Sequence, residues 1–160
     1  EKIIINKINK NVVAYPIGIS NNTELSKLNL SQFTVGGSHH TVGDNALDHN
    51  TLQPLDNVFN QGIFSTTLNE LVTKWGLPFP NYIKIDVDGI EHKIIEGSDS
   101  LLQDKRLKSI LIEINETRQE DKIIIEKMKS NSFVYDKKQI NSTRRNSGPH
   151  KNYVEYLFYR

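Results

Sequence analysis

The chain contains no cysteine among its 160 residues. This absence excludes disulfide bonds, thiolate zinc sites and cysteine nucleophiles. It fits a reducing compartment, so we expect a cytoplasmic protein. An excess of charge is lacking too, because 20 basic and 19 acidic residues leave a formal net charge of +1. We therefore expect neither nucleic acid nor an anionic membrane as a partner.

Long apolar runs are missing as well. Runs such as those at residues 3–5 and 110–112 have the length of a strand, whereas a membrane span needs about 20 residues. We expect no membrane span. The chain begins at Glu1, without a methionine and without an apolar signal segment, which predicts that upstream sequence has been lost. A hydrophobic content of 36% and a charged content of 24% are typical of one soluble globular domain.

What is present is an alternation of strand and helix patterns. The first part of the chain is expected to hold a helix end at 1–10, strands at 11–20 and 23–30, and a long polar loop at 36–62. Helices at 67–75, 90–95 and 121–130 are then expected to alternate with strands at 82–87 and 108–114. The last expected elements are strands at 132–135 and 153–159. This order predicts an α/β fold in a single domain over residues 1–160, with a mostly parallel sheet and crossover helices.

Two strands at the carboxyl end of the chain carry more specific predictions. The strand at 108–114 is almost continuously apolar, which predicts burial on both of its faces. The strands at 132–135 and 153–159 are joined by a basic segment without a helical pattern, which predicts an antiparallel hairpin. In open α/β sheets, ligands bind beyond the carboxyl ends of the parallel strands.

Acidic residues are densest where one predicted strand ends. Asp86 and Asp88 are two residues apart, so they share a face of an extended strand. Gly89 interrupts the strand, and Glu91 opens a helix, where the helix dipole favours a negative charge. Three interpretations remain open: a general base or polar clamp beside a cofactor, a divalent metal site that includes His92, and turn-forming residues without a function.

The motifs around this segment resemble the signature of the FkbM methyltransferases. The resemblance lies in residues 65–71 (STTLNEL), 82–91 (YIKIDVDGIE) and 94–97 (IIEG), with weaker likeness at 110–113 and 152–158. It covers the chain from about Asn11 to its end. One departure is Asp88, where the family usually carries a glutamate with a longer reach.

The resemblance implies a Rossmann-like class I methyltransferase fold with an antiparallel strand at its carboxyl end. It implies S-adenosylmethionine as cofactor, no metal ion, and methylation of a hydroxyl on a small-molecule or glycan acceptor: a sugar, a glycolipid or a natural product. Asp86, Asp88 and Glu91 would be the catalytic residues, and the cofactor would contact Gly18, Ile19, Ser20, Gly37, Ser38 and Asp86. Asp86 is the first choice for a polar or basic role, and Glu91 would order the site through hydrogen bonds.

Features that such folds place near their beginning are not found. The sequence before Asn11 has neither a glycine-rich turn after a first strand nor an acid for the cofactor's ribose. We therefore expect an N-terminally truncated fold that lacks its first strands and is inactive alone. The alternative is a catalytically inactive Rossmann-like module that binds or scaffolds. The oligomeric state is not indicated.

Two further groups of residues could be functional or could be ordinary surface residues. The pair at 39–40, two histidines in the polar loop, could supply a base or bind substrate, although exposed loop histidines often have no role. The basic pairs at 137–138, 144–145 and 150–151 could hold an acidic acceptor, or could form a solvated loop.

Overall fold

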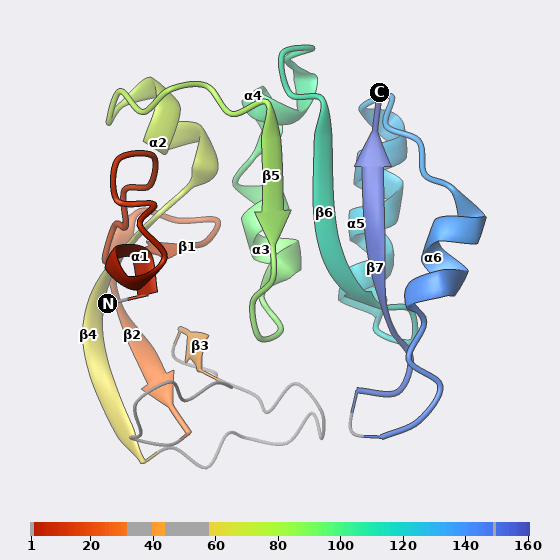
Figure 1. The fold of residues 1–160 in the computed structure, drawn as a ribbon, viewed down its shortest axis with the longest axis horizontal. Coiled ribbons are helices and arrows are strands. Elements are labelled where there is room, and N and C mark those ends of the chain that lie inside the picture. Colours follow the sequence, from red (N-terminus) through yellow and green to blue (C-terminus); the bar gives the residue numbers. More distant parts are fainter. Residues whose placement is uncertain (1, 32–39, 44–57, 149) are drawn as a thin grey trace.

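Two separate sheets organise the chain in the computed structural model, which describes residues 2–31, 40–43, 58–148 and 150–160 (Figure 1). The first sheet has the order β1-β4-β2-β3, with β1 at Gly18–Ile19, β2 at Glu24–Leu30, β3 at Thr41–Val42 and β4 at Phe59–Thr66. The second has the order β5-β6-β7, with β5 at Tyr82–Ile85, β6 at Ser109–Asn115 and β7 at Tyr153–Tyr159.

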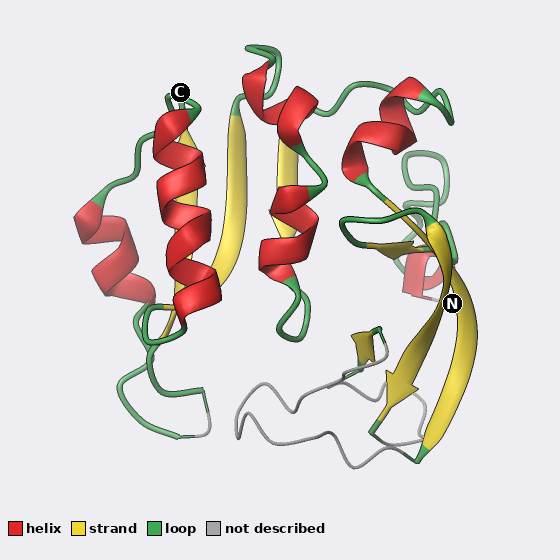
Figure 2. Cartoon of the chain, turned by 180° about the vertical axis from the view of Figure 1, so that it is seen from behind, coloured by secondary structure: helices red, strands yellow, loops and turns green. Residues whose placement is uncertain are grey.

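Six helices complete the described part of the chain: α1 at Lys2–Ile5, α2 at Leu68–Thr73, α3 at Glu91–Glu96, α4 at Asp99–Gln103, α5 at Gln119–Ser130 and α6 at Lys137–Thr143. Figure 2 shows α3, α4 and α5 on one face of the second sheet. None of the helices in these described ranges is long and apolar enough to cross a membrane.

Strand directions are mixed, so the structure is α/β but the expected mostly parallel sheet is not confirmed. In the described residues, β1 pairs with β4 and β5 with β6 in parallel, whereas β2 is antiparallel to both β3 and β4. The first sheet is mostly antiparallel because β2 and β4 pair along their whole length, from Glu24 opposite Ser65 to Leu30 opposite Phe59. The expected antiparallel strand at the carboxyl end is confirmed, since β7 runs antiparallel to β6.

The main core lies between the second sheet and the helices on one of its faces. Along β6 the side chains alternate: Ile110, Ile112 and Ile114 are at most 1% exposed, while Leu111 and Glu113 are partly exposed. The prediction that this strand is buried on both faces is therefore wrong, because α3 and α5 cover only one face. Each apolar side chain buried in this way contributes roughly 1.5–3 kcal/mol to folding.

Three further expectations need correction. The expected strand at 11–20 is reduced to β1, and that at 132–135 to one antiparallel bridge between Val134 and Tyr159. The segment expected to lack a helix contains α6, whose first turn is capped by Asp136: its carboxylate accepts a hydrogen bond of 2.8 Å from the Lys138 N–H. This short helix packs against β7 by burying Ile140.

Candidate active site

A cavity of about 560 Å³ lies between the two sheets. From the first sheet and the segment before it, the walls include Ile17, Gly18, Ile19, Val42 and Ile63. From β5, the turn after it and α3, they include Ile83, Ile85, Val87 and Ile94. These walls are mainly apolar. A volume of several hundred Å³ and an apolar lining with few polar groups are typical of small-molecule sites.

The polar end of the cavity is formed where β5 ends. The strand stops at Ile85, and the turn that follows leads into α3 through Gly89, whose φ is 95°. Only glycine adopts this left-handed region without strain. The turn brings Asp86 and Asp88 onto the cavity wall, at the carboxyl end of a parallel strand.

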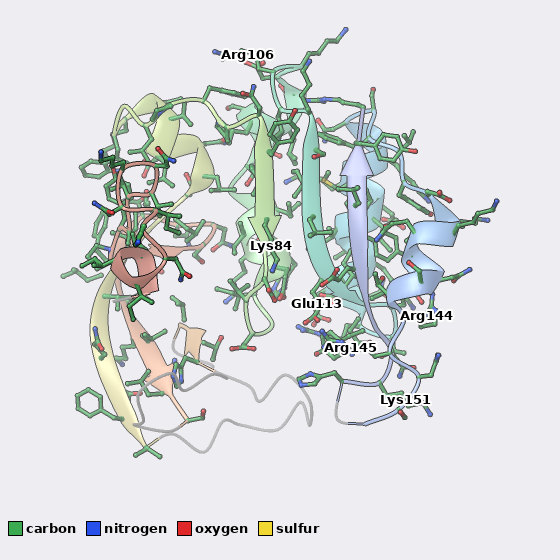
Figure 3. The ribbon with its side chains drawn as sticks, viewed as in Figure 1. Lys84, Arg106, Glu113, Arg144, Arg145 and Lys151 are labelled. Atoms are coloured by element: carbon green, nitrogen blue, oxygen red, sulfur yellow. The ribbon has the colours of Figure 1, made fainter. Side chains whose placement is uncertain are left out.

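Asp86 is held in an ion pair with Lys84, two residues earlier on the same face of β5. The Lys84 Nζ lies 2.7 Å from an Asp86 carboxylate oxygen, and both side chains line the cavity (Figure 3 labels Lys84). The hydrogen bond to Asp86 raises the pKa of Lys84. Since the two side chains are 60% and 57% exposed, the pair contributes little to stability. The pair places a cation and an anion next to each other on the cavity lining.

Glu91 lies away from the cavity wall, although the sequence grouped it with the two aspartates. Its side chain is buried, with 3% of the residue exposed. Burial raises its pKa to about 8; the backbone N–H groups of Glu91 and Gly89 oppose this rise, and the nearby charge of Asp121 adds to it. Glu91 is therefore placed behind the turn that carries Asp86 and Asp88.

A buried polar cluster surrounds Glu91 and supports that turn. The Arg118 Nη2 donates a hydrogen bond of 3.2 Å to the carbonyl oxygen of Gly89, at the turn itself. Asp121, 1% exposed, accepts a hydrogen bond of 2.8 Å from the Asn115 N–H, and burial raises its pKa. Its other oxygen, Oδ1, has no hydrogen-bond partner among the described residues. His92 also belongs to the cluster, where burial and Arg118 lower its pKa.

Sequence reasoning missed Arg118 and Asp121. A signal for Asp121 existed, because it shares the buried face of α5 with Ile124 and Met128 at helical spacing. An acid on an apolar helix face indicates a buried polar contact. No comparable local signal marks Arg118, since its role depends on where the start of α5 lies relative to the Gly89 turn.

The predicted cofactor residues fall into three groups. Gly18 and Ile19 line the cavity. Ser20 is buried but is not part of the cavity wall, and its N–H donates to the Thr66 carbonyl at 3.0 Å. Gly37 and Ser38 lie outside the described residues.

Two of the basic residues near the carboxyl end, Arg144 and Arg145, are paired with acids. Figure 3 shows Arg144 and Arg145 near Glu113, where β6 ends and β7 begins. Arg145 lies 2.8 Å from Glu113, and Arg144 pairs with Glu116, which also accepts a hydrogen bond of 2.7 Å from the Tyr156 hydroxyl. Because both guanidinium groups already face carboxylates, they do not form an open site for an acidic acceptor.

The structure does not support a metal site at the turn after β5. Such a site required Asp86, Asp88 and Glu91 to converge, yet Glu91 lies in the buried cluster. Within the described ranges, no three carboxylate or imidazole side chains come together in a way that could hold a metal ion.

The chain is thus an α/β protein with a cavity at the carboxyl end of a parallel strand. The family model of the methyltransferase FkbM domain matches residues 3–135. The chain therefore belongs to the FkbM methyltransferase family, as its signature residues predicted. Comparison with curated proteins gives no match, and neither does comparison with solved structures.

Proposed function

We propose that the chain is part of an S-adenosylmethionine-dependent O-methyltransferase that modifies a hydroxyl of a sugar, a glycolipid or a natural product. The observation that supports this most is the cavity between the sheets, where Asp86 and Asp88 follow β5 within the region matched to the family. The donor, when bound, supplies an electrophilic methyl group. The protein's task in such a reaction is to align donor and acceptor and to exclude water.

The residues of the cavity fit such a donor. Branched apolar side chains from both sheets can enclose an adenosine ring system, and the carboxylates at the end of β5 suit a positively charged methionine portion. Gly18 adds to this fit: a Cβ there would lie 2.7 Å from the Ile63 Cδ1, so the wall is closely packed at this position. We assign donor contact to Gly18, Ile19 and Asp86.

Separate roles follow for the three predicted catalytic acids. Asp86 and Asp88 line the cavity, and we assign them the orientation of the reacting groups. Glu91 is a positioning residue, because it acts from the buried cluster behind the turn that carries both aspartates.

We further propose that residues 1–160 form one domain whose donor site is completed by additional strands beside β5. In the described residues β5 pairs only with β6, so its other edge carries unpaired backbone groups. An open edge next to a ligand cavity favours the addition of a further strand.

Calorimetric titration with S-adenosylhomocysteine tests both proposals. It would be carried out on the chain of 160 residues and on a form that carries any upstream sequence its gene encodes. Binding by the extended form alone would support an incomplete donor site. Binding by neither form would contradict the methyltransferase proposal and favour an inactive binding module. Equal binding by both would contradict completion of the site by added strands.

Substitution of Asp86 tests its role. In the form that binds S-adenosylhomocysteine, Asp86→Ala should lower transfer of a labelled methyl group into a glycan and lipid extract by about 10²-fold or more. The matched control is Asp99→Ala, which removes an exposed acid of α4 whose partner is Lys127, away from the cavity. If Asp86→Ala retained the turnover of that control, Asp86 would have no catalytic role.

A further inference from the structure

His40 lines the cavity next to the short strand β3. Four other titratable side chains also line this cavity: Tyr15, Lys84, Asp86 and Asp88. His40 is the only imidazole among the described residues that line this cavity. Imidazole is the side chain whose ordinary pKa best suits it to take and release a proton near neutral pH.

The backbone next to His40 is anchored on β2. Thr41 and Val42 pair with Asn29 and Leu28 in antiparallel register. The side chain of Asn29, 3% exposed, donates hydrogen bonds to the carbonyl oxygens of Thr41 at 3.2 Å and Gly43 at 2.6 Å. Because this buried amide bonds one carbonyl oxygen in β3 and one just after it, it holds the backbone next to His40 in place.

The Nδ1 atom of His40 is withdrawn from solvent but has no hydrogen-bond partner in the described part of the chain. A neutral imidazole has one nitrogen that donates and one that accepts. A buried polar atom without a partner has lost the hydrogen bonds it makes to water and is destabilising. On a cavity wall, a bound hydroxyl group would supply the missing hydrogen bond.

We propose that His40 contacts the acceptor in this cavity and receives the proton of the hydroxyl that is methylated. The inference rests on the proposed methyltransferase function and adds its proton acceptor. As the acceptor oxygen forms its bond to the methyl carbon, the carbon–sulfur bond of the sulfonium donor breaks and its electron pair stays on sulfur. The hydroxyl proton passes to the free imidazole nitrogen and then to solvent.

Asp86 also lines the cavity, but its carboxylate is already paired with the Lys84 ammonium group at 2.7 Å. We therefore assign Asp86 the orientation of the reacting groups and His40 the acceptance of the hydroxyl proton.

The test uses the imidazole signals of the protein in long-range ¹H–¹⁵N spectra, recorded across pH on the form that carries any upstream sequence its gene encodes. His40→Gln identifies the His40 signals by their loss. Two ligands are compared: S-adenosylhomocysteine, and sinefungin, which carries an amine where the donor has its sulfonium methyl. The internal control is His92, whose Nδ1 is also buried without a partner in the described residues but which does not line the cavity.

We expect both ligands to bind and the sinefungin ammonium to lower the titration midpoint of His40 by about half a pH unit or more relative to S-adenosylhomocysteine. The midpoint of His92 should be the same in both complexes. If both ligands bind and the His40 midpoint is equal in the two complexes, His40 does not face the reacting carbon and this proposal is wrong, while the proposed function stands. If neither ligand binds, the proposed function is wrong and the role of His40 is lost with it.

Discussion

Glu91 keeps its carboxyl group among buried polar groups rather than in solvent. A carboxylate that is 3% exposed has lost most of its hydration, and the neighbouring Asp121 adds a second acid to the same cluster. Arg118 supplies a cation, which acts on both acids. The protonated form of Glu91 is therefore favoured in the folded chain, since burial penalises the charged form.

The pH dependence of stability follows from this pKa. Burial raises the pKa of Glu91 from 4.5 to about 8, so between these values the folded chain binds a proton that the unfolded chain has released. The stabilisation from this proton is complete below pH 4.5 and is lost as pH rises to about 8. Over this window the free energy of unfolding should fall by up to about 1.4 kcal/mol per pH unit, and Glu91→Gln should flatten the fall in urea titrations.

Asp104→Asn is the matched control for this measurement. Hydrogen bonds from Arg106 lower the pKa of Asp104 to about 2, so its contribution changes only in acid. Between pH 5 and pH 8, the free energy of unfolding of the Asp104→Asn protein should therefore change with pH as steeply as that of the wild type. A Glu91→Gln protein with the wild-type slope would show that Glu91 is not held protonated in the folded chain.

The end of α3 fits tightly against the segment after β1. A Cβ on Gly97 would lie 2.6 Å from the Ser20 carbonyl oxygen and 3.1 Å from the Thr67 Cβ. The φ of Gly97 is −78°, so close approach rather than a left-handed backbone requires glycine here. This contact joins the helix that follows the Asp86 turn to the segment that follows β1, on either side of the cavity.

Gly97→Ala should therefore destabilise the chain by about 1–3 kcal/mol, because the nearest atom belongs to the backbone and cannot rotate away. Gly62→Ala is the control, since a Cβ at Gly62 in β4 would meet no atom within 4 Å. It should change stability by no more than about 0.5 kcal/mol. The midpoints of urea unfolding compare the two variants, and equal midpoints would contradict tight packing at Gly97.

Elements with local chemical signals were predicted well from the sequence. The helix start at Thr67 is confirmed, since its hydroxyl accepts a hydrogen bond of 3.1 Å from the Glu70 N–H, as a capping residue should. The strand before Asp86 is confirmed too, because a short apolar run with a glycine turn is a local pattern. Asp86 and Asp88 reached the cavity wall for the same reason.

Elements that depend on distant partners were missed. The polar sequence of β4 contains few apolar residues, and its strand structure follows from pairing with β2. Trp75, just after α2, is 49% exposed and packs edge-on against Phe64 of β4, a contact with a residue distant in the sequence. The cluster of Glu91, Arg118 and Asp121 was also not predictable, because it requires the starts of α3 and α5 to meet behind one turn.

At the scale of the whole molecule, the cavity is lined by residues of both sheets, which share no strand among the described residues. In the described residues β6 has a partner on both sides, β5 and β7, whereas β5 has one partner and one open edge. The cavity wall includes Ile83 and Ile85 of β5 beside that edge. The proposed donor site therefore lies beside the strand of the second sheet that has an open edge in the described residues.

Hydrogen exchange can measure this asymmetry. In the chain of 160 residues, the amides of β6 should exchange only through global unfolding, because both neighbours bond that strand. The β5 amides that do not bond β6 should exchange at least about 10²-fold faster, since opening a single edge costs less than unfolding the sheet.

A form that carries any upstream sequence its gene encodes should show slower exchange at these β5 amides and leave the β6 amides at the global rate. If the same β5 amides are already as protected as β6 in the chain of 160 residues, another segment covers that edge, and the proposed completion by added strands is wrong.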